Sequence, residues 1–261
     1  MRFTCTGGTI AGNGKISHNL ITPGNNQLYI YIYITLSVVV LLSGSLFFWR
    51  WIIRRCEQAC RADWGIVWLN RLDGLNRIFC RSFHKLRHDP MALRPDSGVL
   101  IASNHVSGLD PLLLVAACDR PLRFVIAREQ YERWWLRWLF KAMGCIPVDR
   151  GKNPRSAFRV ALEALHDGEV VAIFPHGRIH LSHQPPARLK RGVALLAQLA
   201  SVPVLPLRIE GVRGQGMTVA AVLIPSRARI TIFERIHFGK DIYVGMQRLA
   251  ERIGGIAAAP E

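Results

Sequence analysis

The sequence predicts an α/β domain with a largely parallel sheet flanked by helices, preceded by an N-terminal membrane helix. Three observations support this prediction. An uncharged apolar run of 22 residues, 28–49, is long enough to cross about 30 Å of hydrocarbon as a helix. Short apolar runs then alternate with helical stretches between residues 95 and 254, which is typical of a parallel sheet. The 261 residues also suffice for one full hydrophobic core plus an appendage.

The apolar run defines the predicted membrane segment. We expect residues 1–27 to be disordered and residues 28–53 to form a transmembrane or membrane-embedded helix. Only two cations precede the run, whereas Arg50, Arg54 and Arg55 follow it at once. Because cytoplasmic flanks carry such an excess of Lys and Arg, we expect everything after residue 50 to be cytoplasmic. A cleaved signal peptide and a helix lying in the membrane plane are the alternatives.

Residues 54–90 are predicted to form an amphipathic helical segment. Tryptophans and aliphatic residues alternate there with Arg and Lys. This pattern is typical of a helix at the surface of an anionic bilayer. The alternative is an ordinary helix that packs on the domain behind it, and the two do not exclude each other.

The rest of the chain supplies the α/β pattern, element by element. Six apolar runs are predicted as strands: 99–103, 122–127, 145–148, 170–174, 202–209 and 228–234. Four stretches between them have helical periodicity: 111–118, 129–143, 154–166 and 190–200. Strands that alternate with helices form parallel sheets, whose functional side chains gather at the carboxyl ends of the strands.

The charge of the chain restricts its partners. The formal net charge is +16, with 34 Lys and Arg against 18 Asp and Glu. Such a chain favours an anionic membrane surface, a phosphorylated substrate or nucleic acid. We expect no nucleic acid, because no nucleic-acid-binding motif is present and the hydrophobic fraction of 50% favours membrane contact.

A histidine and an aspartate follow the first predicted strand. They lie in residues 104–111, NHVSGLDP, as His105 and Asp110. A carboxylate that holds an imidazole is the usual arrangement for a general base that works near neutral pH. Polar clusters also follow two later strands, as Asp149-Arg150 and His176-Gly177-Arg178.

Four blocks in this order resemble the glycerolipid acyltransferase family, which includes the 1-acylglycerol-3-phosphate acyltransferases. They are 104–111 (NHVSGLDP), 144–151 (GCIPVDRG), 174–179 (FPHGRI) and 202–207 (VPVLPL). The resemblance covers about residues 84–237 and implies an acyltransferase domain at 91–254, with 255–261 as a tail.

The resemblance implies acyl transfer from acyl-CoA or acyl carrier protein to the free hydroxyl of a lysophospholipid, most simply 1-acyl-sn-glycerol 3-phosphate. His105 is then the general base, and Asp110 fixes its tautomer. Backbone N–H groups at the start of the following helix are expected to stabilise the oxyanion. No further cofactor is implied, and the partners are the donor, the acceptor and the bilayer.

Arg150 and Arg178 are the candidate ligands of the acceptor's phosphate, because the guanidinium fork matches phosphate oxygens. Gly177 and His176 belong to the same candidate site. The family usually has Glu where this chain has His176, and in many members the arginine falls one position later, at Ile179. Another lysophospholipid acceptor, or an inactive membrane scaffold of the same fold, therefore remains an alternative.

The histidines near this block suggest one further alternative. His176, His180 and His183 have a spacing close to that of zinc ligands. The stretch continues as Gln-Pro-Pro, which predicts a loop, and no Cys or carboxylate lies nearby. We therefore expect no metal.

Overall fold

The computed structural model describes residues 23–149, 154–181, 183–239 and 241–257. It divides into two compact units with the boundary between Arg50 and Trp51, and each unit is described by itself. The helices are α1 (Pro23–Ala59), α2 (Val67–Ser82), α3 (Asp110–Ala117), α4 (Arg128–Tyr131), α5 (Arg137–Ala142), α6 (Pro154–His166), α7 (Gly192–Ala200), α8 (Val219–Val222) and α9 (Ile242–Ile253). The strands are β1 (Arg87–His88), β2 (Val99–Ser103), β3 (Leu122–Ala127), β4 (Ile146–Val148), β5 (Val170–Ile173), β6 (Val204–Glu210) and β7 (Arg229–Ile232).

The first unit consists of most of helix α1. All its side chains from Leu28 to Arg50 are exposed. The stretch Gln27–Ala59 is long and apolar enough to cross a membrane by length and composition. The helix begins at Pro23, so residues 23–27 are helical, against the expectation of disorder over 1–27. Proline suits this first position, because its missing N–H has no partner there in any helix. Residues 1–22 lie outside the described part of the chain.

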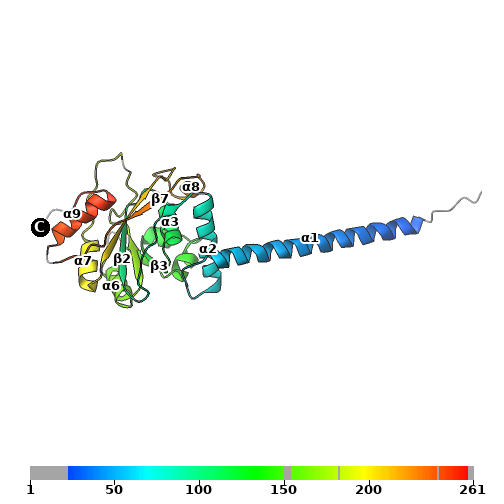
Figure 1. Ribbon diagram of the computed structural model, residues 1–261, viewed down its shortest axis with the longest axis horizontal. Helices are drawn as coiled ribbons and strands as arrows, with labels where there is room; N and C mark the ends of the chain where they lie inside the picture. Colours follow the sequence, from blue (N-terminus) through cyan, green and yellow to red (C-terminus); the bar gives the residue numbers. More distant parts are fainter. Residues whose placement is uncertain (1–22, 150–153, 182, 240, 258–261) are drawn as a thin grey trace, which may run out of the picture. The chain divides into compact units, whose positions relative to one another are not determined.

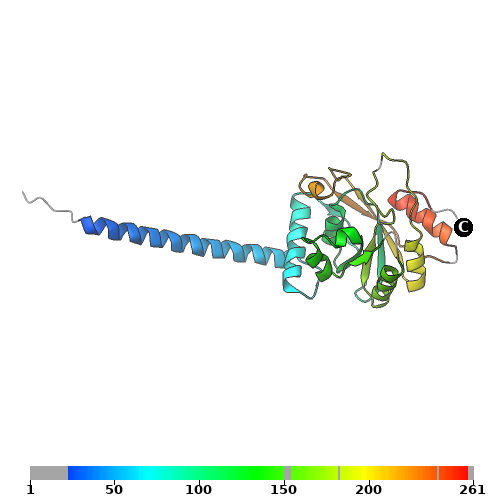
Figure 2. The ribbon, with the colours of Figure 1, turned by 180° about the vertical axis from the view of Figure 1, so that it is seen from behind.

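The second unit contains a seven-stranded sheet with the order β1-β7-β6-β2-β5-β3-β4 (Figures 1 and 2). The five strands from β6 to β4 in this order are all parallel, and β7 pairs antiparallel with β6. Two buried clusters of apolar side chains lie on the two faces. Helices α2 and α3 contribute to one, and α6, α7 and α9 contribute to the other (Figure 1). The predicted α/β class with a largely parallel sheet is confirmed.

The predicted helix at 129–143 is wrong. It is divided into α4 and α5, with a turn between Tyr131 and Arg137. Neither short helix has a fully buried side chain. Burial of an apolar face supplies most of the stability of a protein helix. Because no side chain of α4 or α5 is fully buried, this stabilisation does not extend over the whole of residues 129–143.

The continuous helical segment predicted for 54–90 is also interrupted. α1 ends at Ala59, and α2 starts only at Val67. Gly65 between them has φ +69°, a left-handed conformation that an α-helix cannot continue through. The segment then ends in the two-residue strand β1, which the sequence analysis missed together with α8 and α9.

A buried ion pair connects α2 to the rest of the second unit. The side chains of Arg77 and Asp73 are 1% and 0% exposed and lie 2.6 Å apart. The guanidinium also donates to the backbone oxygens of Ala116 and Cys118, at the end of α3. Arg77 therefore satisfies one carboxylate and two carbonyl groups that water cannot reach.

Replacing Arg77 should destabilise the fold strongly. Arg77→Met leaves the buried Asp73 carboxylate without its cation and the α3 carbonyls without the guanidinium donor, which should lower the free energy of unfolding by about 3–5 kcal/mol. Arg71→Met is the matched control, because Arg71 on the same helix makes only an exposed ion pair with Glu57. That change should cost less than about 1 kcal/mol. Denaturant unfolding in detergent measures both, and equal losses would contradict this role of Arg77.

Candidate active site

The carboxyl ends of β2 and β5 place the candidate residues together. The two strands are neighbours in register, with Ala102 opposite Ile173. His105 therefore emerges beside the turn that follows β5. Asn104 fixes the loop that follows β2. Its side-chain amide donates to the Ile209 carbonyl at 2.8 Å and accepts from the Ile209 N–H at 2.7 Å.

His105 and Asp110 form a hydrogen-bonded pair. His105 Nδ1 lies 2.8 Å from Asp110 Oδ2, and the two side chains are 19% and 0% exposed. Within the described part of the chain, His105 Nε2 has no hydrogen-bond partner. A proton on Nδ1 leaves the lone pair on Nε2, which can accept a proton from a substrate.

Asp110 is held by four hydrogen bonds in all. Besides His105, its carboxylate accepts from the N–H groups of Val106 at 2.6 Å and Ser107 at 2.9 Å. The Ser107 hydroxyl donates to Oδ1 at 2.9 Å. The carboxylate is thus acceptor-only and cannot rotate freely, so it fixes the position and the tautomer of the imidazole.

Two further contacts position the histidine. The Phe174 ring stacks on His105 with a centroid distance of 4.2 Å and an angle of 19° between the planes. Gly108 allows the loop to pack closely, since a Cβ there would lie 2.4 Å from the Thr218 carbonyl oxygen. The loop around Gly108 is also fixed by backbone hydrogen bonds to Gly216 and Met217.

The expected oxyanion donors are not free. The N–H groups of Val106 and Ser107 donate to Asp110, that of Gly108 to Met217, and that of Leu109 to the Ser107 hydroxyl. The loop before α3 therefore uses its N–H groups to hold the Asp110 carboxylate and the loop itself. The sequence could not show this, because the direction of each N–H group depends on the backbone geometry of the loop.

The turn after β5 presents a compact polar cluster. Gly177 has φ +72°, and a Cβ there would lie 2.7 Å from Lys190 Nζ, so the lysine lies directly over the glycine. The Lys190 N–H also donates to the Pro175 carbonyl at 2.9 Å. Arg178 is exposed on the same turn. Lys190 is therefore a further cation of this cluster.

His176 is 7% exposed, and its Nε2 lies 2.7 Å from the Gly254 carbonyl oxygen, to which it donates. Its Nδ1 is buried and has no partner within the described residues. Burial lowers the pKa of His176 below its ordinary 6.5, and the nearby His180 and His105 act in the same direction. His176 is thus neutral and connects the turn to the segment after α9.

The polar pair after β4 is described only in part. Arg150 lies outside the described residues. The preceding Asp149 lies 3.8 Å from Arg128, at the start of α4, which the sequence analysis did not single out. Among the described residues, no group of three or more His, Cys, Asp or Glu side chains could hold a metal ion, and His176 and His180 stack ring on ring instead.

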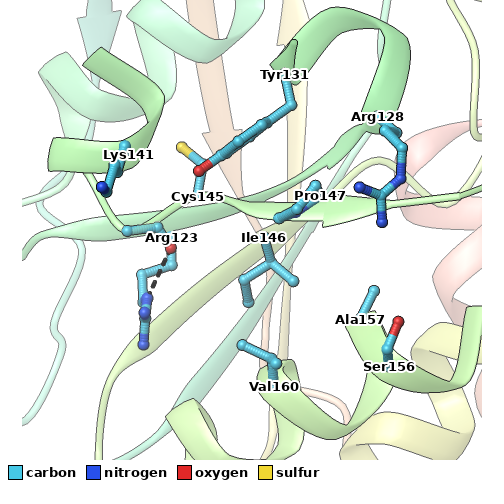
Figure 3. A pocket seen from close by; sticks show the side chains of 11 residues that line it. Arg123, Arg128, Tyr131, Lys141, Cys145, Ile146, Pro147, Ser156, Ala157 and Val160 are labelled. Atoms are coloured by element: carbon cyan, nitrogen blue, oxygen red, sulfur yellow. Dashed lines mark hydrogen bonds between the residues drawn. The ribbon is translucent and has the colours of Figure 1, made fainter. Parts of the chain in front are cut away.

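A separate hollow of about 330 Å³ lies beside β4, between the α4–α5 segment and α6 (Figure 3). None of the predicted site residues that the structure describes lines it. Two of its cations are already paired, because Arg123 contacts Glu169 at 2.5 Å and Arg128 lies near Glu132 and Asp149. We therefore assign the candidate active site to the His105 loop rather than to this hollow.

Comparison with known proteins supports the fold and shows what residues 84–210 resemble. Residues 84–210 match the Acyltransferase family model. The 1-acyl-sn-glycerol-3-phosphate acyltransferase of Bacillus subtilis is 31% identical over 120 residues, 46% of this chain and 59% of the relative. A probable enzyme of the same name from Mycoplasma pneumoniae is 34% identical over 128 residues, 46% of this chain and 47% of the relative. The chain thus spans about half the length of these relatives.

The crystal structure of the 1-acyl-sn-glycerophosphate acyltransferase PlsC from Thermotoga maritima shares the fold. It has a TM-score of 0.56 and 19% identity, and the match covers 88% of this chain and 92% of that one. The His105–Asp110 pair lies inside the matched range 84–210. Through residues 84–210, the chain is similar to the glycerolipid acyltransferases.

Proposed function

We propose that the chain transfers a fatty acyl group from an acyl thioester to the free hydroxyl of 1-acyl-sn-glycerol 3-phosphate, giving phosphatidic acid. The single observation that carries this proposal is the hydrogen bond between His105 and the buried Asp110. It supplies a positioned general base at the carboxyl edge of the sheet, where α/β proteins bind their substrates.

The reaction follows from this geometry. His105 Nε2 removes the proton of the acceptor hydroxyl while the oxygen attacks the thioester carbonyl. The new C–O bond gives a tetrahedral intermediate, which collapses by breaking the C–S bond. The imidazolium, stabilised by Asp110, returns its proton to the leaving thiolate. Because the acceptor attacks directly, this route requires no acyl-enzyme.

Different observations support the proposed donor and the proposed acceptor. A CoA thioester and an acyl-carrier-protein thioester present the same reacting carbonyl, so both are proposed donors, and no other cofactor is needed. For the acceptor, the relatives from B. subtilis and M. pneumoniae are both named for 1-acyl-sn-glycerol 3-phosphate. Arg178 and Lys190 place two cations beside the His105 loop, and both suit a phosphate monoester.

We infer that the enzyme acts at a membrane with its catalytic domain on the cytoplasmic side. Helix α1 is long and apolar enough to span a bilayer. Arg50, Arg54 and Arg55 follow its apolar run, which favours a cytoplasmic location for what comes after. Acyl-CoA and acyl carrier protein are found in that compartment, and the lysophospholipid acceptor resides in the bilayer.

Removing the base should nearly abolish turnover. His105→Ala should lower kcat by roughly 10²–10⁴-fold, because the positioned base that accepts the acceptor's proton is lost. Asp110→Asn should also lower kcat, since it disturbs the tautomer of His105. Transfer of labelled acyl groups in micelles measures both effects. His88→Ala is the control, because His88 lies on the edge strand β1, which β7 and β6 separate from β2, and it should keep full activity. An active His105→Ala enzyme would contradict the assignment.

The phosphate assignment makes a different prediction. Arg178→Ala should raise the KM for lysophosphatidic acid about tenfold or more, because a charge-assisted hydrogen bond to the phosphate is lost. The KM for acyl-CoA should stay unchanged. A panel that adds lysophosphatidylethanolamine, lysophosphatidylglycerol and glycerol 3-phosphate identifies the acceptor. If the variant affects every acceptor and the donor equally, Arg178 does not bind the acceptor's phosphate.

The buried neutral histidines predict how stability depends on pH. Burial lowers the pKa of both His176 and His84 in the folded state. Below the ordinary value of 6.5, the unfolded chain binds protons that the folded chain resists, so the free energy of unfolding should fall as the pH falls. Thermal unfolding at about pH 7.5 and about pH 5.5 measures this loss. His176→Gln, which keeps a donor for Gly254, should reduce it, and an unchanged pH dependence would contradict the interpretation.

A further inference from the structure

Four tryptophans of the second unit are exposed to solvent. Trp134 is 87% exposed, Trp138 57%, Trp68 42% and Trp135 40%. They are named here the tryptophan cluster. Such large aromatic side chains are highly buried on average, so this much exposure in one region indicates a surface that contacts something else.

The tryptophan cluster connects two elements that are distant in sequence. Trp68, on α2, contacts Trp138, on α5, with a centroid distance of 5.3 Å and an angle of 47°. The Trp138 Nε1–H donates to the Trp135 carbonyl at 2.9 Å, which fixes the turn before α5. Two aliphatic side chains of α2, Val67 and Leu75, are also exposed, at 65% and 49%. The result is one apolar area on α2 and the α4–α5 segment.

Positive charge accompanies this area. Arg133, Arg137 and Lys141 alternate with the tryptophans, and residues 133–142 contain no carboxylate. Within the described chain, none of these three cations forms an ion pair, whereas Arg71 on α2 pairs with Glu57. An apolar aromatic surface with unpaired cations is complementary to an anionic bilayer, because tryptophan prefers the membrane interface and cations are attracted to the anionic lipids.

We propose that the tryptophan cluster docks the second unit on an anionic membrane surface, as a contact separate from helix α1. The segment that carries it leaves the carboxyl end of β3, the same sheet edge at which His105 lies. Docking there brings the second unit against the bilayer that contains a lipid acceptor. The proposal concerns membrane contact and does not rest on the reaction proposed above.

The full-length chain in bilayer nanodiscs allows a direct test. The protein is labelled with 5-fluorotryptophan, and the Trp134 and Trp138 resonances are assigned from W134F and W138F. Spin-labelled lipid in a nanodisc with anionic phospholipid should broaden both resonances. Two other resonances are internal controls. Trp64 packs on the core, and its resonance should stay sharp. Trp51 follows the apolar run, and its resonance reports on membrane contact of the α1 region.

Two outcomes overturn the proposal. The first is that the Trp51 resonance broadens while those of Trp134 and Trp138 stay sharp, which would show that only the α1 region meets the membrane. The second is that the two resonances broaden on addition of unlabelled protein rather than in response to the lipid label, which would make the cluster a contact between copies. Neither readout requires catalysis, so failure of the proposed reaction is distinguishable.

A matched pair of double variants tests how loss of this docking affects acyl transfer. W134S/W138S should lower the rate of acyl transfer to a vesicle-embedded acceptor about tenfold. The rate with a short-chain, water-soluble acceptor should change less than about twofold. L195S/L199S is the control, because these exposed leucines lie on α7, which packs on the other face of the sheet. Equal effects of the two double variants on vesicle-embedded acceptor would contradict the proposal.

Discussion

The buried carboxylate of Asp110 is the constraint around which the active-site loop is built. A carboxylate without exposed surface requires donors for its oxygens, and here it receives them from His105, the Ser107 hydroxyl and two backbone N–H groups. These bonds determine the path of the chain between β2 and α3. Ser107 supplies two of these donors. Gly108, which follows it, allows the loop to pass close to Thr218.

The parallel sheet completes the site around this loop. Because β2 lies between β5 and β6, His105 meets Phe174 from one neighbour, and Asn104 binds the backbone of the other. The turn after β5 contributes His176, Gly177 and Arg178, and Lys190 is contributed by the end of the same connection, just before α7. His176 in turn binds Gly254, so the segment after α9 also supports the turn. Residues far apart in sequence thus meet at one edge.

The sequence predicted the elements whose physical signal is local. Strands β2 and β3 were predicted with the observed bounds, because each is a short apolar run between polar residues. The pairing of His105 with Asp110 was also predicted, since the two residues lie on one short loop. The division of 129–143 was missed, because the residues have helical periodicity but the structure buries none of them fully.

Other features depend on contacts that no local pattern records. The bond between His176 and Gly254 joins residues separated by 78 positions, and its existence depends on how α9 packs. The oxyanion donors expected before α3 are occupied by Asp110, which follows only from the geometry of the loop. Arg150 lies outside the described residues, so its role as a phosphate ligand stays a prediction.

The central claim is that His105 activates the acceptor for direct attack on the thioester. Intact-protein mass spectrometry of the full chain, mixed rapidly with acyl-CoA and lysophosphatidic acid, tests it most directly when product and free CoA are quantified in the same samples. The account predicts equal amounts of phosphatidic acid and CoA, with no acyl group on the protein at any time. An acylated protein that passes its acyl group to the acceptor would contradict the account.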